Sequence, residues 1–377
     1  MTTKLGVGII GCGNISHAYL RLAPLFKSLE LKAVADINMD AAKARAEEFP
    51  VRASTVEDLL AADDIDVIVN LTIPAVHYEI TTRILEAGKH AYSEKPLVLT
   101  LDEAKALKAL ADEKGLRVGS APDTFLGGAH QLARAVIDEG KVGRIIGGTC
   151  HVQNHGMEHW HPNPDFFFQP GAGPVLDLGP YYVTNLIQLI GPVKRVGAMA
   201  SISFPERKIA NGPREGEMLK VNTPTNIHAI LEFENGAIVT LGASWDVWKH
   251  RHFNMELYGE EGSLYVPDPN FFGGHVEMSE RGADVAEIAE RGHPFGIANQ
   301  PKDAPTQANY RCAGLADMAT AIAEGRPHRC SLELAVHAVD VMTSILKSGE
   351  TGEFVEMTTT CERPASLSPE EAEALMA

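Results

Sequence analysis

Apolar positions along residues 1–122 alternate between short strand-like runs and helix-spaced stretches. The runs predict strands at residues 5–10, 31–35, 66–71, 90–93 and 116–120. The run at 66–71 (DVIVNL) is centred on β-branched residues, as is typical of a parallel strand covered on both faces. Helices are predicted between the strands, at residues 14–29, 40–49, 75–87 and 101–114. This alternation with short connections predicts an α/β domain over residues 1–122, built on a doubly wound parallel sheet.

The pattern changes after residue 122. The segment Glu234-Asn235-Gly236 between two alternating runs indicates a β-hairpin. Two stretches rich in proline, glycine and charge, 204–225 and 267–305, are expected to form excursions. We predict an α+β domain over residues 123–360 with a large, open, mostly antiparallel sheet, and an acidic, loosely held tail over residues 361–377. Its strands are expected at 144–153, 196–203, 226–233, 237–243, 254–258 and 263–266, and its helices at 125–139, 177–190, 311–324 and 332–346.

The composition narrows the class of partner. The 377 residues carry 33 Lys and Arg against 50 Asp and Glu, a net charge of −17, which disfavours nucleic acid and anionic membranes. Five scattered cysteines without a CxxC pair indicate reduced thiols rather than disulfides or a zinc ribbon. No apolar run is long enough to span a membrane, and the first residues lack the apolar core of a signal peptide. We expect a cytoplasmic protein without a membrane or nucleic-acid partner.

A glycine-rich turn follows the first predicted strand, at residues 11–16 (GCGNIS). Such a turn lets a pyrophosphate approach the N-terminus of the next helix. Asp36 ends the second predicted strand, where a carboxylate accepts hydrogen bonds from both adenosine-ribose hydroxyls and repels a 2′-phosphate. The pattern therefore favours NAD over NADP. The alternatives are FAD, although nothing later resembles a flavin domain, and a glycine turn without a ligand.

Two polar turns are predicted at the same edge of the sheet, at residues 70–74 (NLTIP) with His77 and at residues 94–96 (EKP). Ligands of open α/β sheets bind at this carboxyl edge. A third cluster contains Asp177 and Tyr181, which are four residues apart and would share one face of a single helix. Read in isolation, residues 70–74 also fit an ordinary strand-to-helix turn, and residues 94–96 fit a surface ion pair before a turn proline. Asp177 also fits a helix cap, and Tyr181 fits a core tyrosine.

Histidines concentrate at residues 155–161 (HGMEHWH). The segment matches the HxxEH pattern of zinc proteases, but Gly156 and the following prolines oppose the helix that such a site needs. We predict no metal and interpret the segment as a loop over the substrate pocket. In that loop Trp160 would stack on a ring of the substrate, and His159 or His161 would donate hydrogen bonds to it. The alternative is ordinary loop packing.

Taken together, the motifs GCGNIS (11–16), NLTIPAVH (70–77), SEKPL (93–97), GAGPVLDLGPYY (171–182) and SLELAVHAVDVM (331–342) resemble the glucose-fructose oxidoreductase/inositol dehydrogenase/rhizopine catabolism (Gfo/Idh/MocA) family over about residues 4–346. The resemblance implies a Rossmann domain, and a sheet domain that joins the subunits of a homodimer or homotetramer. It also implies oxidation or reduction of a sugar, polyol or cyclitol with nicotinamide. Lys95 and Asp177 match the family's catalytic lysine and aspartate. The usual histidine four residues after the aspartate is Tyr181 here, as in the glucose-fructose oxidoreductase, dihydrodiol dehydrogenase and xylose dehydrogenase branches.

The predicted site has three catalytic residues. Tyr181 is the expected acid/base with Lys95 beside it, and Asp177 would orient a neighbouring hydroxyl; Lys95 as the base is the rival assignment. The predicted cofactor-binding residues are Gly11, Gly13, Asn14, Ile15, Asp36, Leu71, Thr72, Pro74, His77, Glu94 and Lys95. The predicted substrate-binding residues are Lys95, Asp177, Tyr181, His159, Trp160 and His161.

Three functions remain open at this point. The first is an NAD-dependent dehydrogenase for a small carbohydrate. The second is a glycosidase that uses NAD transiently, and the third is a non-enzymatic dinucleotide sensor. The retained set of Lys95, Asp177 and Tyr181 argues against the sensor, which has no need of an acid/base pair.

Overall fold

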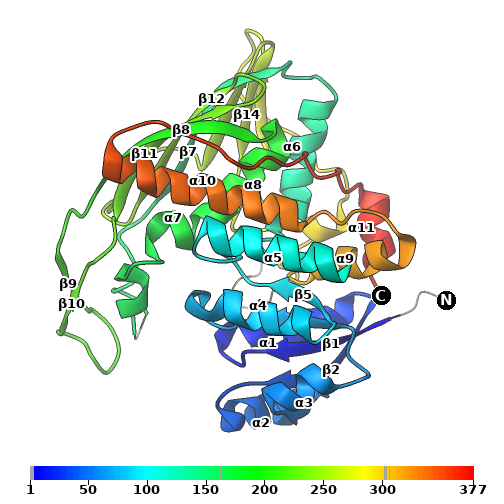
Figure 1. Cartoon of the computed structure of the whole chain (residues 1–377). Helices are drawn as coiled ribbons and strands as arrows, with labels where there is room; N and C mark the ends of the chain where they lie inside the picture. Colours follow the sequence, from blue (N-terminus) through cyan, green and yellow to red (C-terminus); the bar gives the residue numbers. More distant parts are fainter. Residues whose placement is uncertain (1–3, 162, 301–303, 305) are drawn as a thin grey trace.

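A computed structural model of the chain describes residues 4–161, 163–300, 304 and 306–377. The described residues form two large sheets and one two-stranded sheet, with helices around and between the two large sheets (Figure 1). The parallel α/β sheet and the large second sheet were both predicted from the sequence, and both are confirmed.

The first sheet has six parallel strands in the order β3-β2-β1-β4-β5-β6, the arrangement of a Rossmann domain. Because β1, β4 and β5 are neighbours and run in the same direction, the turns that follow them meet at one edge. The elements of this domain are β1 (Leu5–Ile10), α1 (Asn14–Leu22), β2 (Leu29–Ala35), α2 (Met39–Glu48), β3 (Arg52–Ser54), α3 (Val56–Ala61), β4 (Val67–Asn70), α4 (His77–Glu86), β5 (His90–Ser93), α5 (Leu101–Lys114) and β6 (Val118–Ser120).

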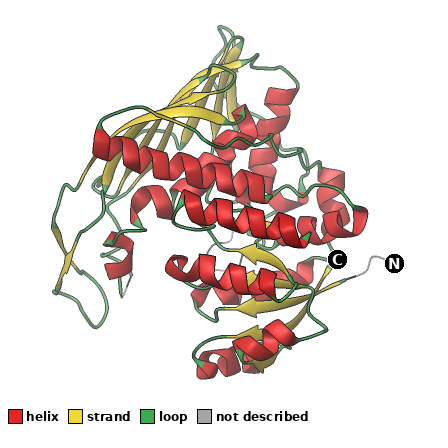
Figure 2. Ribbon diagram, viewed as in Figure 1, coloured by secondary structure: helices red, strands yellow, loops and turns green. Residues whose placement is uncertain are grey.

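The second sheet has nine strands in the order β16-β15-β14-β13-β7-β12-β11-β8-β17, and every neighbouring pair except β7 and β12 is antiparallel. Helices cover one face of this sheet (Figure 2). The elements from residue 128 onward are α6 (Gly128–Asp138), β7 (Ile145–Gln153), α7 (Gly173–Asp177), α8 (Gly179–Ile190), β8 (Val193–Ser201), β9 (Glu206–Lys208), β10 (Met218–Lys220), β11 (Asn226–Phe233), β12 (Ile238–Ser244), β13 (Met255–Gly259), β14 (Gly262–Val266), β15 (Glu277–Glu280), β16 (Ala286–Glu287), α9 (Ala313–Glu324), α10 (Leu332–Thr351), β17 (Val355–Glu356) and α11 (Pro369–Leu375).

The other face of the nine-stranded sheet is exposed in this chain. Burial alternates along β11, where Leu231 is buried and its neighbour Ile230 is half exposed, and Met199 on β8 is 81% exposed. The pattern agrees with the open sheet predicted from the sequence. Association through this face, as a homodimer or homotetramer, remains a prediction.

Helix α10 connects the two halves of the molecule. It packs against β8 and α8 on one side and against α5 of the Rossmann domain on the other (Figure 1). Helix α9 packs against β6, and the Ser120 N–H donates to the Cys330 carbonyl. After strand β16 the chain therefore returns to the first sheet through α9, and after α10 it adds β17 to the edge of the second sheet beside β8.

Two expectations for the second half of the chain were wrong. Asp177 and Tyr181 do not lie on one helix, because α7 ends at Asp177 and α8 begins at Gly179. Pro180 lacks the N–H that would continue the helical hydrogen bonds. The tail after Cys361 is not loose, since Leu367 and Leu375 are buried and the Lys27 N–H donates to the Leu375 carbonyl.

The two excursions contain short strands. Strands β9 and β10 form a hairpin within 204–225, and β15 and β16 form another within 267–305. Residues 301–303 and 305 of the second excursion lie outside the described residues.

Candidate functional site

The glycine turn leaves the start of α1 open. Gly11 has a φ of 104°, and a Cβ at this position would lie 2.6 Å from the backbone of Leu71, so only glycine fits. Gly13 is the N-cap residue of α1, no side chain caps the helix, and a Cβ at Gly13 would meet no atom within 4 Å. Asn14 and Ile15 form the first turn behind it. This open, uncapped helix end fits the pyrophosphate of a dinucleotide.

Asp36 lies directly beside this turn. Its carboxylate accepts the Cys12 N–H on Oδ2 at 2.8 Å and the Asn38 N–H on Oδ1 at 2.8 Å. These two bonds orient the carboxylate and leave further lone pairs for ribose hydroxyls. The following residue, Ile37, is fully exposed and offers no charge.

Arg45 is a cation at the glycine turn that we did not predict from the sequence. Its Nε donates to Ser16 Oγ at 2.9 Å and its Nη2 donates to the Gly13 carbonyl at 3.2 Å. Arg45 lies in α2, far from the glycine turn in the sequence, so no local motif predicted the contact. The arginine fixes the turn and adds positive charge beside it.

The turn after β4 is held by buried hydrogen bonds. Asn70 donates to the His77 carbonyl at 3.1 Å, and the Thr72 hydroxyl donates to Asn70 Oδ1 at 2.6 Å. The His77 ring lies between the carbonyls of Pro96 (2.7 Å) and Thr72 (3.0 Å), and burial lowers its pKa. His77 therefore braces the turns after β4 and β5 from behind. Leu71 is buried, and Thr72 and Pro74 are half buried beside it.

Lys95 connects this sheet edge to the second half of the chain. Its Nζ donates to the Asp177 carbonyl at 2.6 Å and to Asp177 Oδ1 at 3.1 Å, and lies 4.9 Å from the centre of the Tyr181 ring. The preceding Glu94 is buried and accepts hydrogen bonds from the Tyr19 hydroxyl and the Lys95 N–H. The structure thus brings together Lys95, from the turn after β5, and the pair Asp177 and Tyr181, from the junction of α7 and α8.

The charge state of Lys95 follows from its neighbours. Burial favours the neutral amine, but Asp177, Tyr181 and Glu94 outweigh burial and hold the pKa of Lys95 above its ordinary value. Lys95 is therefore a stable ammonium ion and cannot accept a proton near neutral pH.

Arg311 is a second residue at this site that the sequence did not reveal. Its Nη2 donates to the Tyr181 hydroxyl at 3.3 Å across 130 residues of sequence. Cys312, the next residue, has a φ of 89°, which is uncommon outside glycine. Asp123 accepts the N–H groups of Cys312 (3.0 Å) and Gly314 (3.1 Å) and so holds this strained turn. Burial raises the pKa of Asp123 to about 6, against the opposing effect of Arg311.

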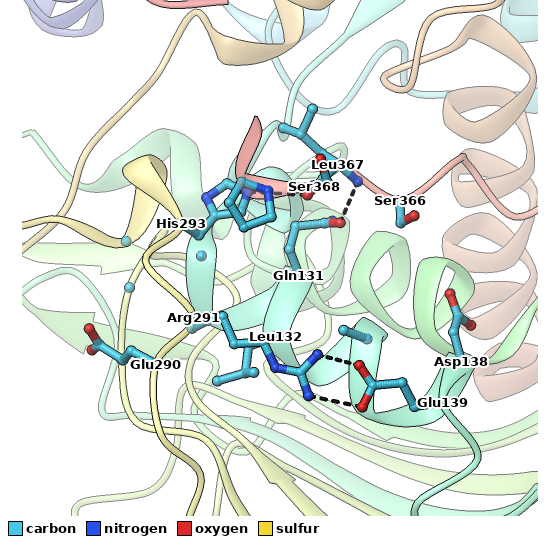
Figure 3. Close-up of a pocket in the computed structure, with 17 residues that line it drawn as sticks. Gln131, Leu132, Asp138, Glu139, Glu290, Arg291, His293, Ser366, Leu367 and Ser368 are labelled. Carbon is cyan, nitrogen blue, oxygen red and sulfur yellow. Dashed lines mark hydrogen bonds and ion pairs between the residues drawn. The ribbon is translucent and has the colours of Figure 1, made fainter. Parts of the chain in front are cut away.

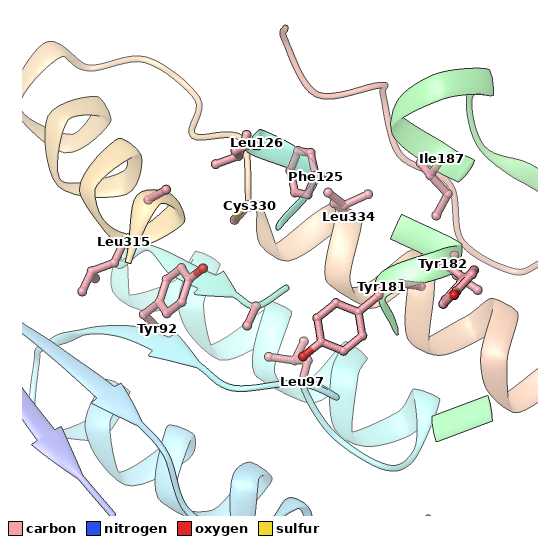
Figure 4. Close-up of a cluster of buried hydrophobic side chains, with 14 of the residues drawn as sticks. Tyr92, Leu97, Phe125, Leu126, Tyr181, Tyr182, Ile187, Leu315, Cys330 and Leu334 are labelled. Carbon is pink, nitrogen blue, oxygen red and sulfur yellow. The ribbon is translucent and has the colours of Figure 1, made fainter. Parts of the chain in front are cut away.

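Tyr181 belongs to an apolar layer between the two sheets. It is 5% exposed and belongs to the same buried cluster as Tyr92, Leu97 and Phe125 (Figure 4). Packing of this kind fixes the ring and keeps most water away from its hydroxyl.

Lys95, Asp177 and Tyr181 line one cavity of about 570 Å³. Trp160 also lines it, whereas His159 and His161 of the same loop do not. Its aromatic walls are Trp160, Phe167, Tyr181, Tyr182 and Phe271, and its other polar walls are Gln153, Asn154, His250, Asn254, Asp268 and Asn270. A cavity of this size with several hydrogen-bonding groups fits a small polar molecule.

The loop that carries Trp160 is fixed by a buried ion pair rather than by a helix. Arg207 on β9 pairs with Glu158 and with Asp246, and all three side chains are buried. Its Nη1 also donates to the His155 carbonyl at 3.0 Å. Residues 155–159 are not helical, so the segment lacks the geometry of a zinc-protease helix, and Glu158 is bound to Arg207 instead.

A second cavity, of about 400 Å³, lies between α6, the loop at residues 290–296 and the tail (Figure 3). Arg291 pairs with Glu139 at its wall, and the Leu367 N–H donates to Gln131 Oε1 at 2.7 Å. This cavity shares no residue with the Lys95 cavity.

Comparison with known proteins gives matches for both domains. Residues 5–121 match a family described as "Oxidoreductase family, NAD-binding Rossmann fold", and residues 130–265 match the "GFO/IDH/MocA C-terminal domain". No helix in the described part of the chain is long and apolar enough to cross a membrane.

Among curated relatives, a levoglucosan dehydrogenase of Pseudarthrobacter phenanthrenivorans is 28% identical over 290 residues, which is 69% of this chain and 73% of the relative. A dTDP-3,4-didehydro-2,6-dideoxy-alpha-D-glucose 3-reductase of Saccharopolyspora spinosa is 28% identical over 275 residues, 71% of this chain and 75% of the relative. Among solved structures, levoglucosan dehydrogenase in complex with NADH and L-sorbose gives a TM-score of 0.78 at 22% identity, covering 95% of this chain and 100% of that chain. At this identity the structural match establishes the shared fold.

Proposed function

Because this chain belongs to the GFO/IDH/MocA family of NAD-binding oxidoreductases, we propose that it transfers a hydride between NAD and a secondary hydroxyl of a sugar, polyol or cyclitol. The observation that supports this most directly is the convergence of Lys95, Asp177 and Tyr181 in one cavity. This cavity adjoins the edge of the sheet at which ligands of Rossmann domains bind. NAD, when bound, supplies the hydride acceptor.

In this reaction Tyr181 is the residue that accepts and donates the proton. Its hydroxyl oxygen takes the proton of the substrate carbinol during oxidation and returns it during reduction. The Lys95 ammonium over its ring and the Arg311 guanidinium at its oxygen stabilise the negative charge that develops there. Since Lys95 already carries its proton, it serves as a charge beside the reaction rather than as the base. Asp177, oriented by Lys95, holds a neighbouring hydroxyl of the substrate.

The experiment is a nicotinamide absorbance assay with purified protein, NAD or NADP, and a panel of monosaccharides, anhydrosugars, inositols and polyols. We expect NAD reduction with one class of compound. No reduction across the panel, in a sample whose NAD binding is confirmed by fluorescence, would overturn the proposal. Net conversion of a glycoside without accumulating NADH would instead indicate the glycosidase.

Asp36 is expected to select NAD over NADP. In the Asp36→Ala variant, the KM for NAD is expected to rise about tenfold or more, because a charge-assisted hydrogen bond to ribose is worth about 1.5–3 kcal/mol. The ratio of kcat/KM for NADP to that for NAD should rise, because the charge that repels a 2′-phosphate is gone. Steady-state kinetics with both cofactors measure this ratio. An unchanged ratio would show that Asp36 does not select the cofactor.

A further inference from the structure

Asp268 lies on the wall of the Lys95 cavity, in the loop after β14. Its Oδ1 accepts two hydrogen bonds, from the Tyr182 hydroxyl at 3.0 Å and from the Asn270 N–H at 3.0 Å. The Tyr182 hydroxyl accepts a hydrogen bond from Asn254 Nδ2 at 2.9 Å. Because Tyr182 is buried and packed in α8, this chain of bonds fixes the orientation of the carboxylate.

The second oxygen of Asp268 has no such partner. No donor from the described residues reaches Oδ2, and no Lys, Arg or His of that part of the chain forms an ion pair with Asp268. Burial raises the pKa of the Asp268 carboxyl, and only the Asn270 N–H and the Tyr182 hydroxyl oppose this effect. A half-buried carboxylate without a cation destabilises the folded protein, so its presence in a cavity indicates a functional role.

The charges around the cavity limit what the free oxygen can bind. Among the described residues, Lys95 is the single lysine or arginine that lines the cavity, and it is paired with Asp177. Arg311 donates to the Tyr181 hydroxyl but does not line the cavity. Two exposed cations, Lys249 and Arg251, flank His250 but do not line the cavity. An anionic group placed in the cavity would therefore meet the uncompensated charge of Asp268, whereas a hydroxyl would donate a hydrogen bond to it.

We propose that Asp268 determines substrate specificity: its free oxygen accepts a hydrogen bond from a hydroxyl of an uncharged sugar or polyol, away from the reacting carbinol, and its charge excludes phosphorylated, carboxylated and nucleotide-linked sugars. This inference rests on the proposed function and goes beyond it. The relatives do not decide the point, since one is named for an uncharged anhydrosugar and another for a dTDP-sugar.

The test compares Asp268→Asn with the wild type on the best neutral substrate of the panel. Asparagine keeps the shape of the side chain and the acceptor for Tyr182 and Asn270. We expect KM to rise about tenfold or more, with kcat changing less than about threefold, because a contact remote from the reacting atoms contributes to binding. The melting temperature should not fall, since a desolvated charge is removed. Asp284→Asn, an exposed carboxylate on the same half of the chain, is the control and should leave KM unchanged.

Charge exclusion is tested with D-glucose and D-glucose 6-phosphate. The preference for the neutral sugar should be strong in the wild type and should fall in Asp268→Asn. An unchanged KM in the variant, or a wild type that prefers the phosphate, would overturn the inference.

Failure of the proposed function would be a separate result. If the wild type oxidises no sugar, thermal protection of the NAD-loaded protein by the two glucose compounds replaces turnover as the measurement. Protection by D-glucose that is lost in Asp268→Asn would support the role of Asp268. Equal protection of both proteins, or protection only by the phosphate, would contradict it.

Discussion

Replacing Tyr181 with phenylalanine is expected to lower kcat by at least about 100-fold, the usual loss when a positioned general acid/base is removed. The substitution deletes one oxygen from a ring that is 5% exposed, so the packing between the two sheets should persist. Lys95 cannot take over the proton, because Asp177 and its other neighbours keep it as the ammonium ion. Arg311 is likewise a permanent cation. The two cations that contact Tyr181, Lys95 and Arg311, therefore cannot replace it as the base.

The measurement is steady-state turnover with NAD and the best substrate of the panel. NAD binding and the melting temperature are followed in parallel, and both should remain near the wild-type values. Tyr258→Phe, a half-exposed tyrosine on β13, is the matched control and should retain full activity. A loss of turnover below about tenfold in Tyr181→Phe would remove this residue from the acid/base role.

Replacing Arg207 with methionine is expected to lower the free energy of unfolding by about 3–5 kcal/mol, because it leaves two buried carboxylates without their cation. Glu158 and Asp246 both pair with Arg207, and all three side chains are less than about one-tenth exposed. The same arginine holds the His155 carbonyl. Since Trp160 follows in this loop and lines the Lys95 cavity, KM should rise as well.

Urea unfolding measures the loss of stability, and Arg214→Met provides the control. Arg214 also pairs with two carboxylates, Asp165 and Glu217, but it is 32% exposed, so solvent screens these ion pairs and its loss should lower the free energy of unfolding by much less. A loss in Arg207→Met no larger than that in Arg214→Met would show that the buried ion pair does not stabilise this part of the fold.

The Rossmann domain was predicted well because its signals are local. Helix α5 has the bounds that the sequence predicts: Thr100 and Glu103 form a capping box at its start, and Gly115 ends it in the left-handed conformation. Strand β5 also has its predicted bounds, residues 90–93. Six strands of the second sheet, β7, β8 and β11 to β14, were found by their alternation, with ends displaced by at most three residues. The short strands β3, β15, β16 and β17 were not predicted.

The errors came from effects that local patterns do not contain. The helix break at residue 178 depends on a proline that is also common in the first turn of a helix, so it was not recognised as a break. The tail was judged by its acidic residues, but a few apolar side chains, Leu367 and Leu375 among them, suffice to dock it.

Only part of the candidate site could be predicted from the sequence. Lys95, Asp177 and Tyr181 lie in short motifs with recognisable neighbours, and the fold then places them in one cavity. Arg311 reaches Tyr181 from a segment without any motif, through a strained turn at Cys312. Asp268 joins the cavity from a loop of the second domain. Such contacts arise from tertiary packing, which a single sequence does not reveal.

The proposed reaction is hydride transfer between NAD and a carbinol carbon. It is tested most directly with the sugar or polyol that reduces NAD fastest, prepared with deuterium on its carbinol carbons. After turnover, mass spectrometry follows the deuterium. We expect one deuterium in the reduced nicotinamide for each ketone formed, with a rate that falls sharply in Tyr181→Phe. Product formation without deuterium in the nicotinamide, or with the deuterium returned to the sugar, would contradict it.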